Sequence, residues 1–406
     1  MPTRIPLLCV AAALAASGRS RADTVLVAEK PAKDLSWTVL QCVLKDLPPS
    51  SRVRLKSRDG GKEIPVQAQP EDGGLRLVWV APALAAGSSA AWDVEVLDGK
   101  EEKGPARVEV REEGPKRTRI LVDGKEIAAL VHDPDQRKPY LYPIIGPNGR
   151  PITRAFPMET GVEGEKQDHP HQRSLWFTHG DVGGVDFWSE TRSAGRVRQI
   201  EIERTESGPV HGRIVTRNEW LAPDGRKVLA DRRTLTVYPL ERGEWLLDVE
   251  IVLLASEGPV KFGDTKEGTF GIRLAETMKE ERGGIIVNSR GARGMLLTWG
   301  KPAEWVDYHG KVAEDVVGVA ILDHPTSFRH PTHWHVRDYG LFAANPFGYG
   351  AFYAGEKKDG SHTLPKGEML RFRYRVYFHH GPAEKAAVER VYQGFASPPA
   401  VVPQAK

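Results

Sequence analysis

The stretch LRFRYRVYF, residues 370–378, decides the fold class of this chain of 406 residues. Apolar and aromatic side chains occupy every second position, from Leu370 through Tyr374 to Phe378, and arginines fill most of the positions between them. Successive side chains of a β-strand point to opposite faces, so this alternation gives one apolar and one charged face. A helix would scatter the same residues around its circumference. The stretch therefore predicts a β-strand with one buried face.

The same alternation recurs in WLLDVEIVLL (245–254) and RVRQIEIER (196–204), and turn signals such as APDGRK (222–227) separate such runs. Shorter apolar runs divided by Gly, Pro and Asp fill the chain from residue 24 to about residue 100. This spacing is typical of a small all-β sandwich. The charged segment DGKEEKGPA (98–106) interrupts the pattern and is interpreted as a linker.

Helical periodicity is confined to PAEKAAVERVYQGF, residues 382–395, where Val388, Val391 and Tyr392 belong to one apolar stripe. We therefore predict an all-β fold, in which a small N-terminal β-sandwich precedes a large two-sheet β-supersandwich with a short C-terminal helix. The predicted segments are a signal peptide at 1–22, the small sandwich at 23–100, the supersandwich at 107–395 and a disordered tail at 396–406.

The predicted signal peptide begins MPTRIPLLCVAAALAASGRSRAD, in which Arg4 precedes a short apolar run and then small residues. A membrane-spanning helix needs about 20 apolar residues, so neither this run nor any later one predicts a span. We expect a secreted or periplasmic protein. Removal of the signal would leave Cys42 as the one cysteine, without an intramolecular disulfide. The net charge is +3 and the basic residues are dispersed, which excludes a nucleic-acid partner.

Polar residues first concentrate in DHPHQRSLWFTHGDVGGVDFW, residues 168–188. His169 and His171 would share one face of a strand, although Pro170 between them favours a loop or an edge. Arg173 offers a bidentate fork to a carboxylate, and His179 with Asp181 follows an apolar run.

Three further segments of the same kind follow along the chain. Asp264, Lys266 and Glu267 lie between glycines in KFGDTKEG, and a lysine beside a carboxylate can stabilise an oxyanion. The run WGKPAEWVDYHG (299–310) places aromatic rings beside acceptors, which is the mixture that a sugar site needs; its candidates are Trp305, Asp307 and Tyr308. The densest segment, LDHPTSFRHPTHWHVRDYGLFAANPFG (322–348), adds a second His-x-His pair; its candidates are His333, His335, Arg337 and Asn345.

A divalent metal is compatible with this set, because zinc takes about four ligands and two His-x-His pairs with Glu267 could supply them. No HExxH, CxxC or calcium-loop motif fixes that interpretation, and the sequence shows no required cofactor. The absence of GxGxxG, GxxxxGK[ST] and GxSxG removes support for dinucleotide, phosphate-loop and serine-hydrolase chemistry.

The segments together resemble the PmoA-like family of secreted bacterial proteins, named after a methane monooxygenase subunit. The resemblance covers about residues 107–382 and includes PYLYPIIGPNGRPITRAFP (139–157) besides three of the polar segments. It implies a supersandwich like that of galactose mutarotases and a carbohydrate-related role. The family motif resembles DHPHHRG, whereas this chain has Gln172 and Ser174 in place of the last His and the Gly, which weakens a strict metal role.

We predict from these residues an exported carbohydrate-active enzyme of the epimerase, lyase or hydrolase type. His171 or His335 would take a proton, Glu267 or Asp264 would donate one, and a cation would stabilise negative charge. The candidate cations are Lys266, Arg173 and Arg337. The predicted substrate-binding residues are His169, His179, Asp181, Asp264, Trp305, Asp307, Tyr308, His333 and Asn345. The alternatives are a non-catalytic glycan-binding protein with the same cleft and, third, a metal-dependent oxygenase. The partner in the first two cases is a sugar or glycan.

Overall fold

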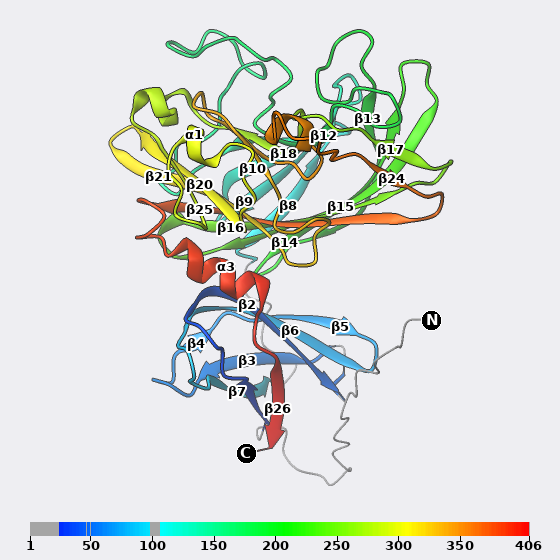
Figure 1. Ribbon diagram of the computed structural model, residues 1–406. Helices are drawn as coiled ribbons and strands as arrows, with labels where there is room; N and C mark the ends of the chain where they lie inside the picture. Colours follow the sequence, from blue (N-terminus) through cyan, green and yellow to red (C-terminus); the bar gives the residue numbers. More distant parts are fainter. Residues whose placement is uncertain (1–23, 46, 49, 98–105, 406) are drawn as a thin grey trace.

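The computed structural model describes residues 24–45, 47–48, 50–97 and 106–405 and is an all-β protein, as predicted (Figure 1). A large sandwich lies above a small one, and one helix lies between them. The predicted signal peptide and all but the last residue of the predicted linker lie outside the described residues. Within the described part of the chain, the helices are all too short to cross a membrane.

The large sandwich consists of two antiparallel sheets of eight strands each. The first sheet has, in spatial order, β22 (Trp334–Val336), β23 (Leu341–Ala344), β18 (Gly268–Arg273), β12 (Leu175–His179), β11 (Tyr140–Ile144), β10 (Lys125–Val131), β9 (Arg117–Val122) and β8 (Val108–Glu113). The second sheet has β13 (Arg196–Glu206), β14 (Gly212–Leu221), β15 (Lys227–Pro239), β16 (Trp245–Leu254), β25 (Met369–His380), β21 (Asp315–Asp323), β20 (Trp305–Val312) and β19 (Ile285–Asn288). A separate pair is formed by β17 (Val260–Phe262) and β24 (His362–Leu364).

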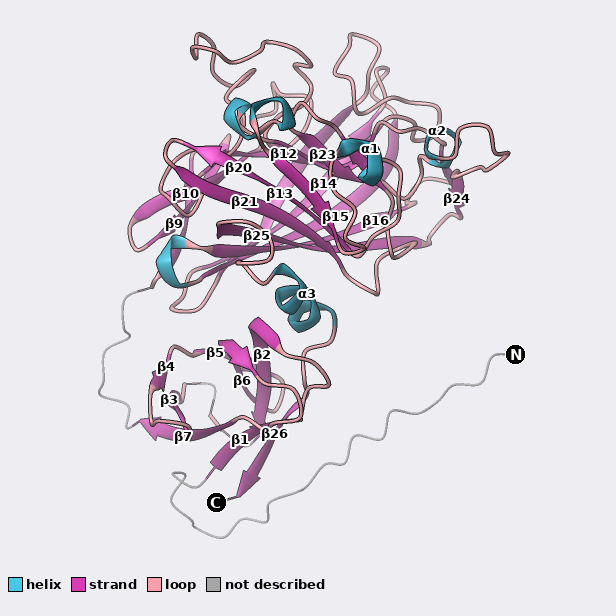
Figure 2. Cartoon of the chain, turned by 60° about the vertical axis from the view of Figure 1, so that its left-hand side comes forward, coloured by secondary structure: helices cyan, strands magenta, loops and turns pink. Residues whose placement is uncertain are grey.

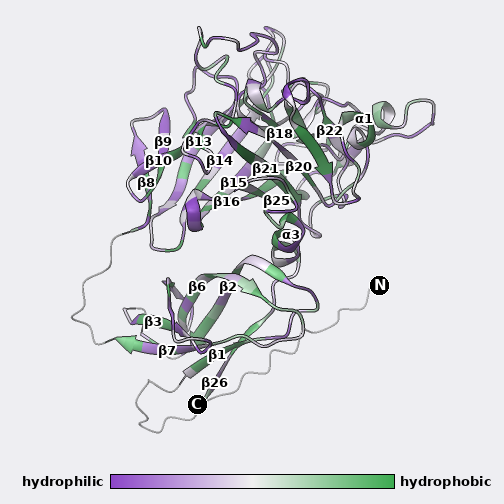
Figure 3. Cartoon of the chain, turned by 90° about the vertical axis from the view of Figure 1, so that its left-hand side faces the viewer, coloured by the Kyte–Doolittle hydropathy of each residue, from purple (hydrophilic) through white to green (hydrophobic). Residues whose placement is uncertain are grey.

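The stretch 370–378 lies in β25, in the middle of the second sheet. Its apolar residues, among them Phe372 and Phe378, are buried in the core between the two sheets. On the opposite face, Arg371 pairs with Glu250. The predicted alternation is thus the observed one. Figure 3 shows hydrophobic residues gathered around β20, β22 and β25 and a more hydrophilic edge around β9 and β10.

The small sandwich also has two sheets, around a core of its own that includes Leu26 and Trp79. One sheet has β26 (Val401–Ala405), β1 (Thr24–Ala28), β7 (Ala91–Leu97), β3 (Arg52–Ser57) and β4 (Glu63–Ile64). The other has β2 (Leu35–Lys45), β6 (Gly74–Leu84) and β5 (Gln67–Glu71). The last strand of the chain therefore belongs to the sandwich that the first strand begins.

The predicted disordered tail is wrong in its last residues. Val401–Ala405 pair with Thr24–Ala28 as β26, because the edge of β1 offers backbone hydrogen bonds to an extended chain. The predicted helix is present as α3 (Val388–Ala396), which starts later than residue 382. Two shorter helices are α1 (Met295–Thr298) and α2 (Tyr349–Phe352).

Helix α3 packs between the two sandwiches, as Figure 2 shows. Its buried Val391 and Phe395 share a cluster with Val78 of β6 and Tyr377 of β25. Helix α3 therefore covers part of the outer face of the second sheet and joins it to the small sandwich.

Candidate functional site

A cavity of about 580 Å³ lies on the outer face of the first sheet. Along β12, Phe177 points into the core between the sheets, whereas Trp176 points outward and packs on Trp188 and Ala343. His335 is paired with Ala343 and shares its face. The lining residues are His169, His171, Gln172, Gly180, Asp186, Trp188, Ser189, Thr265, Lys266, Glu267, His335, Arg337 and Tyr339.

The loop 168–173, which carries the first pair of histidines, is not a strand. His169 has a left-handed φ of 44°, and Gln172 N donates to the carbonyl oxygen of His169 at 3.0 Å, so the segment is a turn. The predicted shared strand face of His169 and His171 is therefore wrong, as Pro170 had suggested. The two rings still meet, edge to face, with centroids 5.8 Å apart.

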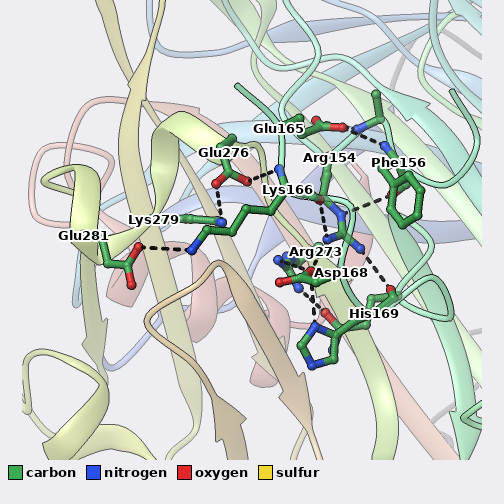
Figure 4. Close-up of polar contacts among 12 residues, drawn as sticks. Arg154, Phe156, Glu165, Lys166, Asp168, His169, Arg273, Glu276, Lys279 and Glu281 are labelled. Atoms are coloured by element: carbon green, nitrogen blue, oxygen red, sulfur yellow. Dashed lines mark hydrogen bonds and ion pairs between the residues drawn. The ribbon is translucent and has the colours of Figure 1, made fainter. Parts of the chain in front are cut away.

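Two buried arginines hold this loop in place (Figure 4). Arg154 Nη1 donates to Asp168 Oδ1 at 2.5 Å, and Arg273 Nη2 donates to the same oxygen at 3.0 Å. Arg154 Nη2 also donates to the carbonyl oxygen of His169 at 3.0 Å, and Arg273 Nη1 donates to Gln172 Oε1. Charge-assisted bonds of this kind are stronger than neutral ones. The loop is thus fixed to β18 and to the segment before the cis Phe156–Pro157 bond by ion pairs.

The Asp168 carboxyl is held as an anion by these contacts. Partial burial acts to raise its pKa, but Arg273, a hydrogen bond from His169 and the contact with Arg154 lower the pKa more, to about 2. On the other side of the loop, His169 stacks on Tyr339 with centroids 5.2 Å apart. The guanidinium of Arg273 lies 4.5 Å from the same tyrosine ring. One end of the cavity therefore combines aromatic surface with fixed charge.

His171 lies between this end and Trp188, whose ring centroid is 6.2 Å away. Burial lowers the pKa of His171 to about 4; the neighbouring Lys138 and His169 side chains act in the same direction, whereas Glu267 and Glu190 oppose the shift. Its imidazole is therefore neutral at pH 7. Among the described residues, its ring nitrogens have no hydrogen-bond partner, so they are available to a ligand.

Lys266 and Glu267 enter the cavity from the turn before β18, where they form an ion pair with each other. Gly180 N donates to the carbonyl oxygen of Glu267 at 2.7 Å, which ties this turn to the end of β12. Asn345 Nδ2 donates to the carbonyl oxygen of Thr265 at 3.0 Å. The predicted binding residue Asn345 thus holds the turn in place from outside the cavity.

His335 enters from β22 and is 3% exposed. Burial lowers its pKa to about 4; Glu267 opposes this shift, Lys266 and Arg337 add to it, and a hydrogen bond to the Lys266 backbone opposes it. Its Nδ1 atom is buried without a hydrogen-bond partner among the described residues. Unpaired buried polar atoms are uncommon and call for an explanation such as a ligand or a water molecule. Glu267 acts on the pKa of both His171 and His335, which places its carboxylate within electrostatic reach of both rings.

Arg337 and Tyr339 belong to the tight turn between β22 and β23. The carbonyl oxygen of Asp338 accepts hydrogen bonds from Tyr308 Oη at 2.9 Å and from Glu280 N at 2.9 Å. The predicted binding residue Tyr308 therefore acts beneath the turn and does not line the cavity. Its hydroxyl fixes the backbone that presents Arg337.

Behind Trp188 lies a second group of buried charges. Arg173 and Glu190 form a bidentate pair, and Lys138 Nζ lies 3.0 Å from Glu190 Oε1. Burial lowers the pKa of Lys138 to about 8, with Glu190 opposing the shift. Arg173 was predicted to stabilise charge on a substrate, but its guanidinium is already used by Glu190 and does not line the cavity.

The structure brings six of the predicted residues into one cavity: His169, His171, Lys266, Glu267, His335 and Arg337. Their catalytic and binding roles stay predictions. Three other candidates lie elsewhere for local reasons. Because side chains alternate along β12, that of His179 points to the inner face of the first sheet, where its Nε2 atom bonds the carbonyl oxygen of Gly263. Asp181 accepts from Gly184 N in a turn, and Asp264 accepts from the backbone N–H groups of two glycines.

The remaining candidates also have structural partners outside the cavity. Trp305 Nε1 donates to Glu389 of α3, and Asp307 lies fully buried between His309 and His379. His333 bonds the hydroxyl of Tyr353 at 2.8 Å. The second His-x-His pair is therefore split, and only His335 reaches the cavity.

For a metal ion, the described residues contain no group of three or more His, Cys, Asp or Glu side chains in a suitable arrangement. In particular, Glu267 is paired with Lys266, and His333 faces Tyr353. The ligand set that the sequence suggested for zinc is therefore not assembled by this part of the chain.

Several residues of the site were not singled out from the sequence. They are Arg154, Asp168, Gln172, Asp186, Trp188, Ser189, Thr265, Arg273 and Tyr339. Asp186 closes a turn by accepting from the backbone N–H groups of Trp188 and Ser189. Arg154 and Arg273 occur in stretches that look like ordinary strands and loops, so no local signal separates them from surface arginines.

The fold and the cavity define a class of protein: an all-β chain of two sandwiches with a polar, histidine-rich cavity on the outer face of the larger one. Residues 117–393 match the sequence pattern of DUF6807, a family of unknown function. The chain belongs to this family. The match supplies no link to the PmoA-like name.

Two solved structures resemble the chain: an alpha-mannosidase from Enterococcus faecalis V583 and a protein in the glycosyl hydrolase family 38 from Enterococcus faecalis. Each is 10% identical to this chain with a TM-score of 0.44. The alignments cover 94% and 95% of this chain but 46% and 48% of the two structures, so the chain spans about half their length. No curated protein sequence matches.

Proposed function

We propose that the cavity is the active site of an exported enzyme that acts on a sugar or glycan by acid–base chemistry. The observation that carries this proposal is the position of Glu267, which acts on the pKa of both His171 and His335 in one cavity. Two neutral imidazoles beside an ion-paired carboxylate are the groups that proton transfer needs near pH 7.

The roles follow from the charge state of each group. Within the described part of the chain no residue bonds the ring nitrogens of His171, which would take a proton from the substrate. His335, whose Nδ1 atom has no hydrogen-bond partner in the described ranges, is the second candidate for the same role. Without substrate, Lys266 forms an ion pair with Glu267. When the substrate breaks this ion pair, Lys266 would stabilise an oxyanion. Epimerisation and β-elimination use these parts directly, and hydrolysis by two separated carboxylates has the least support.

A sugar is supported as the substrate by the composition of the lining. Polar groups from Gln172, Ser189 and Thr265 can exchange hydrogen bonds with hydroxyls, and the Tyr339 ring supplies apolar surface. The resemblance to PmoA-like proteins implies the same class of ligand.

The test is a screen of oligosaccharides and keto-sugars with the wild type, His171→Ala and a control, His380→Ala. His380 lies at the end of β25, where its ring bonds the carbonyl oxygen of Arg242. Turnover that is lost in His171→Ala and retained in His380→Ala supports the proposal. A sugar that binds the wild type and His171→Ala equally, without turnover by either, favours the glycan-binding alternative. Loss of activity on removal of metal ions would favour the oxygenase alternative.

A further inference from the structure

The charged side chains that line the cavity are two cations, Lys266 and Arg337, and two carboxylates, Glu267 and Asp186, but they are not all paired with one another. Of the four charged side chains that line it, Lys266 is paired with Glu267, and Asp186 is satisfied by its own turn. The fourth is Arg337. Among the described residues, its guanidinium has no hydrogen bond or ion pair with a carboxylate and lies 5.6 Å from the Tyr339 ring.

The surroundings add positive charge to the same region. On one side, two buried arginines, Arg154 and Arg273, share a single carboxylate, that of Asp168. This group lies next to His169 and Tyr339, which line the same end of the cavity as Arg337. An anion bound here would lie near two arginines that share one carboxylate and near Arg337, which has no carboxylate partner among the described residues.

On another side, behind Trp188, Lys138 and Arg173 share one carboxylate, that of Glu190. The side chains of Arg154, Arg273 and Lys138 are buried, where charges are screened less than on the surface. Asp338 is the neighbouring acid of the turn, but it does not line the cavity. The two groups together hold four cations (Arg154, Arg273, Lys138 and Arg173) and two carboxylates (Asp168 and Glu190), and this excess of positive charge favours an anionic ligand over a neutral one.

We propose that the substrate is an acidic sugar and that the Arg337 guanidinium binds its anionic group, a carboxylate or a sulfate. This inference rests on the proposed function, because it names the substrate class of that same site. The planar fork of arginine matches the paired oxygens of both groups. The aromatic ring of Tyr339 keeps the guanidinium in place, and the turn beneath it is held by Tyr308 and Glu280.

The position of Arg337 also suits the chemistry of such a sugar. His335 lies in β22 and Arg337 follows this strand, with one residue between them, and both line the cavity, so an anion on Arg337 would lie near the neutral imidazole. Neutralising a carboxylate makes the proton on the adjacent carbon easier to remove. A uronate bound here would thus present that proton toward the two histidines.

The test measures binding of matched sugars to the full chain by titration calorimetry: D-galacturonate against D-galactose, with the methyl ester of galacturonate and galactose 6-sulfate as further probes. We expect the wild type to bind an acidic sugar at least about tenfold more tightly than its neutral counterpart, as one charged hydrogen-bonding contact gives. Tighter binding of galacturonate than of galactose 6-sulfate would indicate that the site binds a carboxylate, and the reverse order would indicate a sulfate.

Arg337→Gln should reduce this preference about tenfold or more, and Arg337→Lys should retain part of it. Arg217→Gln, which removes an exposed arginine paired with Glu201, is the matched control and should leave the preference unchanged. Urea denaturation of each variant checks the fold. Equal binding of acidic and neutral sugars by the wild type overturns the inference and leaves the sugar site standing. Binding of neither overturns the proposed function and this inference with it.

Discussion

Replacing Asp168 with asparagine removes the carboxylate that two buried arginines share, and we expect it to destabilise the fold by about 1–2 kcal/mol at pH 7. The pKa of Asp168 is lowered from an ordinary value of 3.8 to about 2. At about 1.4 kcal/mol per pKa unit, this difference corresponds to roughly 2.5 kcal/mol of stabilisation by the ionised form. The side chain is 36% exposed, so solvent screening reduces the effect.

The sign of the pH dependence follows from linkage. The folded-state pKa of Asp168 lies below the unfolded one, so its contribution is fully present above about pH 4 and is lost as the pH falls through about 2. The difference in unfolding free energy between wild type and Asp168→Asn should therefore be constant from pH 7 to pH 5 and shrink below pH 4. Urea denaturation with linear extrapolation at each pH measures it.

The matched control is Asp123→Asn, which breaks the exposed pair with Arg107 and should change the stability by less than about 0.5 kcal/mol. If Asp168→Asn were as stable as this control, Asp168 would not hold the arginines as argued. The reasoning would also be refuted by a difference that stays the same between pH 7 and pH 2.

Three further predictions concern the site and the chain end. If His335 acts as a base, turnover should persist from pH 7 to about pH 5 and fall as the pH drops through about 4, because a protonated imidazole accepts no proton; a pH–rate profile checks this. Tyr308→Phe removes the hydroxyl that holds the Asp338 carbonyl and should cost about 1–2 kcal/mol in urea denaturation, with weaker ligand binding at Arg337. Deleting residues 401–406 removes β26 from the edge of β1 and should lower the thermal midpoint of the small sandwich, whereas an unchanged midpoint would mean that this strand adds no stability.

The sequence predicted the fold class well because strand alternation is a local signal. The stretch 245–254 coincides with β16, and 196–204 lies within β13. The end of the chain was not predictable in the same way. Val401–Ala405 has no alternation of its own, and its strand state depends on pairing with Thr24–Ala28 at the other end of the sequence. The pattern of a short sequence segment carries no information on pairing between residues so far apart in the chain.

The candidate site was predicted only in part, because some of its contacts are local in the sequence and others form only in the fold. Six candidates meet in the cavity, because the segments that carry them flank neighbouring strands of the first sheet. Two histidines separated by one residue share a face only within a strand. The first pair lies in a turn around Pro170, and His333 of the second pair bonds Tyr353 outside the cavity, so the rule fails for both pairs. The arginines at 154 and 273 were missed because their role depends on Asp168, a partner that only the fold brings near.

The loop with His169 and His171 has little regular backbone pairing, so its geometry depends on the ion pairs of Asp168 rather than on a strand ladder. The proposed catalytic histidine, His171, and the carboxylate that positions its loop, Asp168, have different pKa values. The pKa of His171 is about 4, and that of Asp168 is about 2. On acidification the histidine would therefore be protonated while the loop is still anchored. A loss of activity near pH 4 should then be reversible and occur without unfolding of the loop, because its anchoring carboxylate remains ionised.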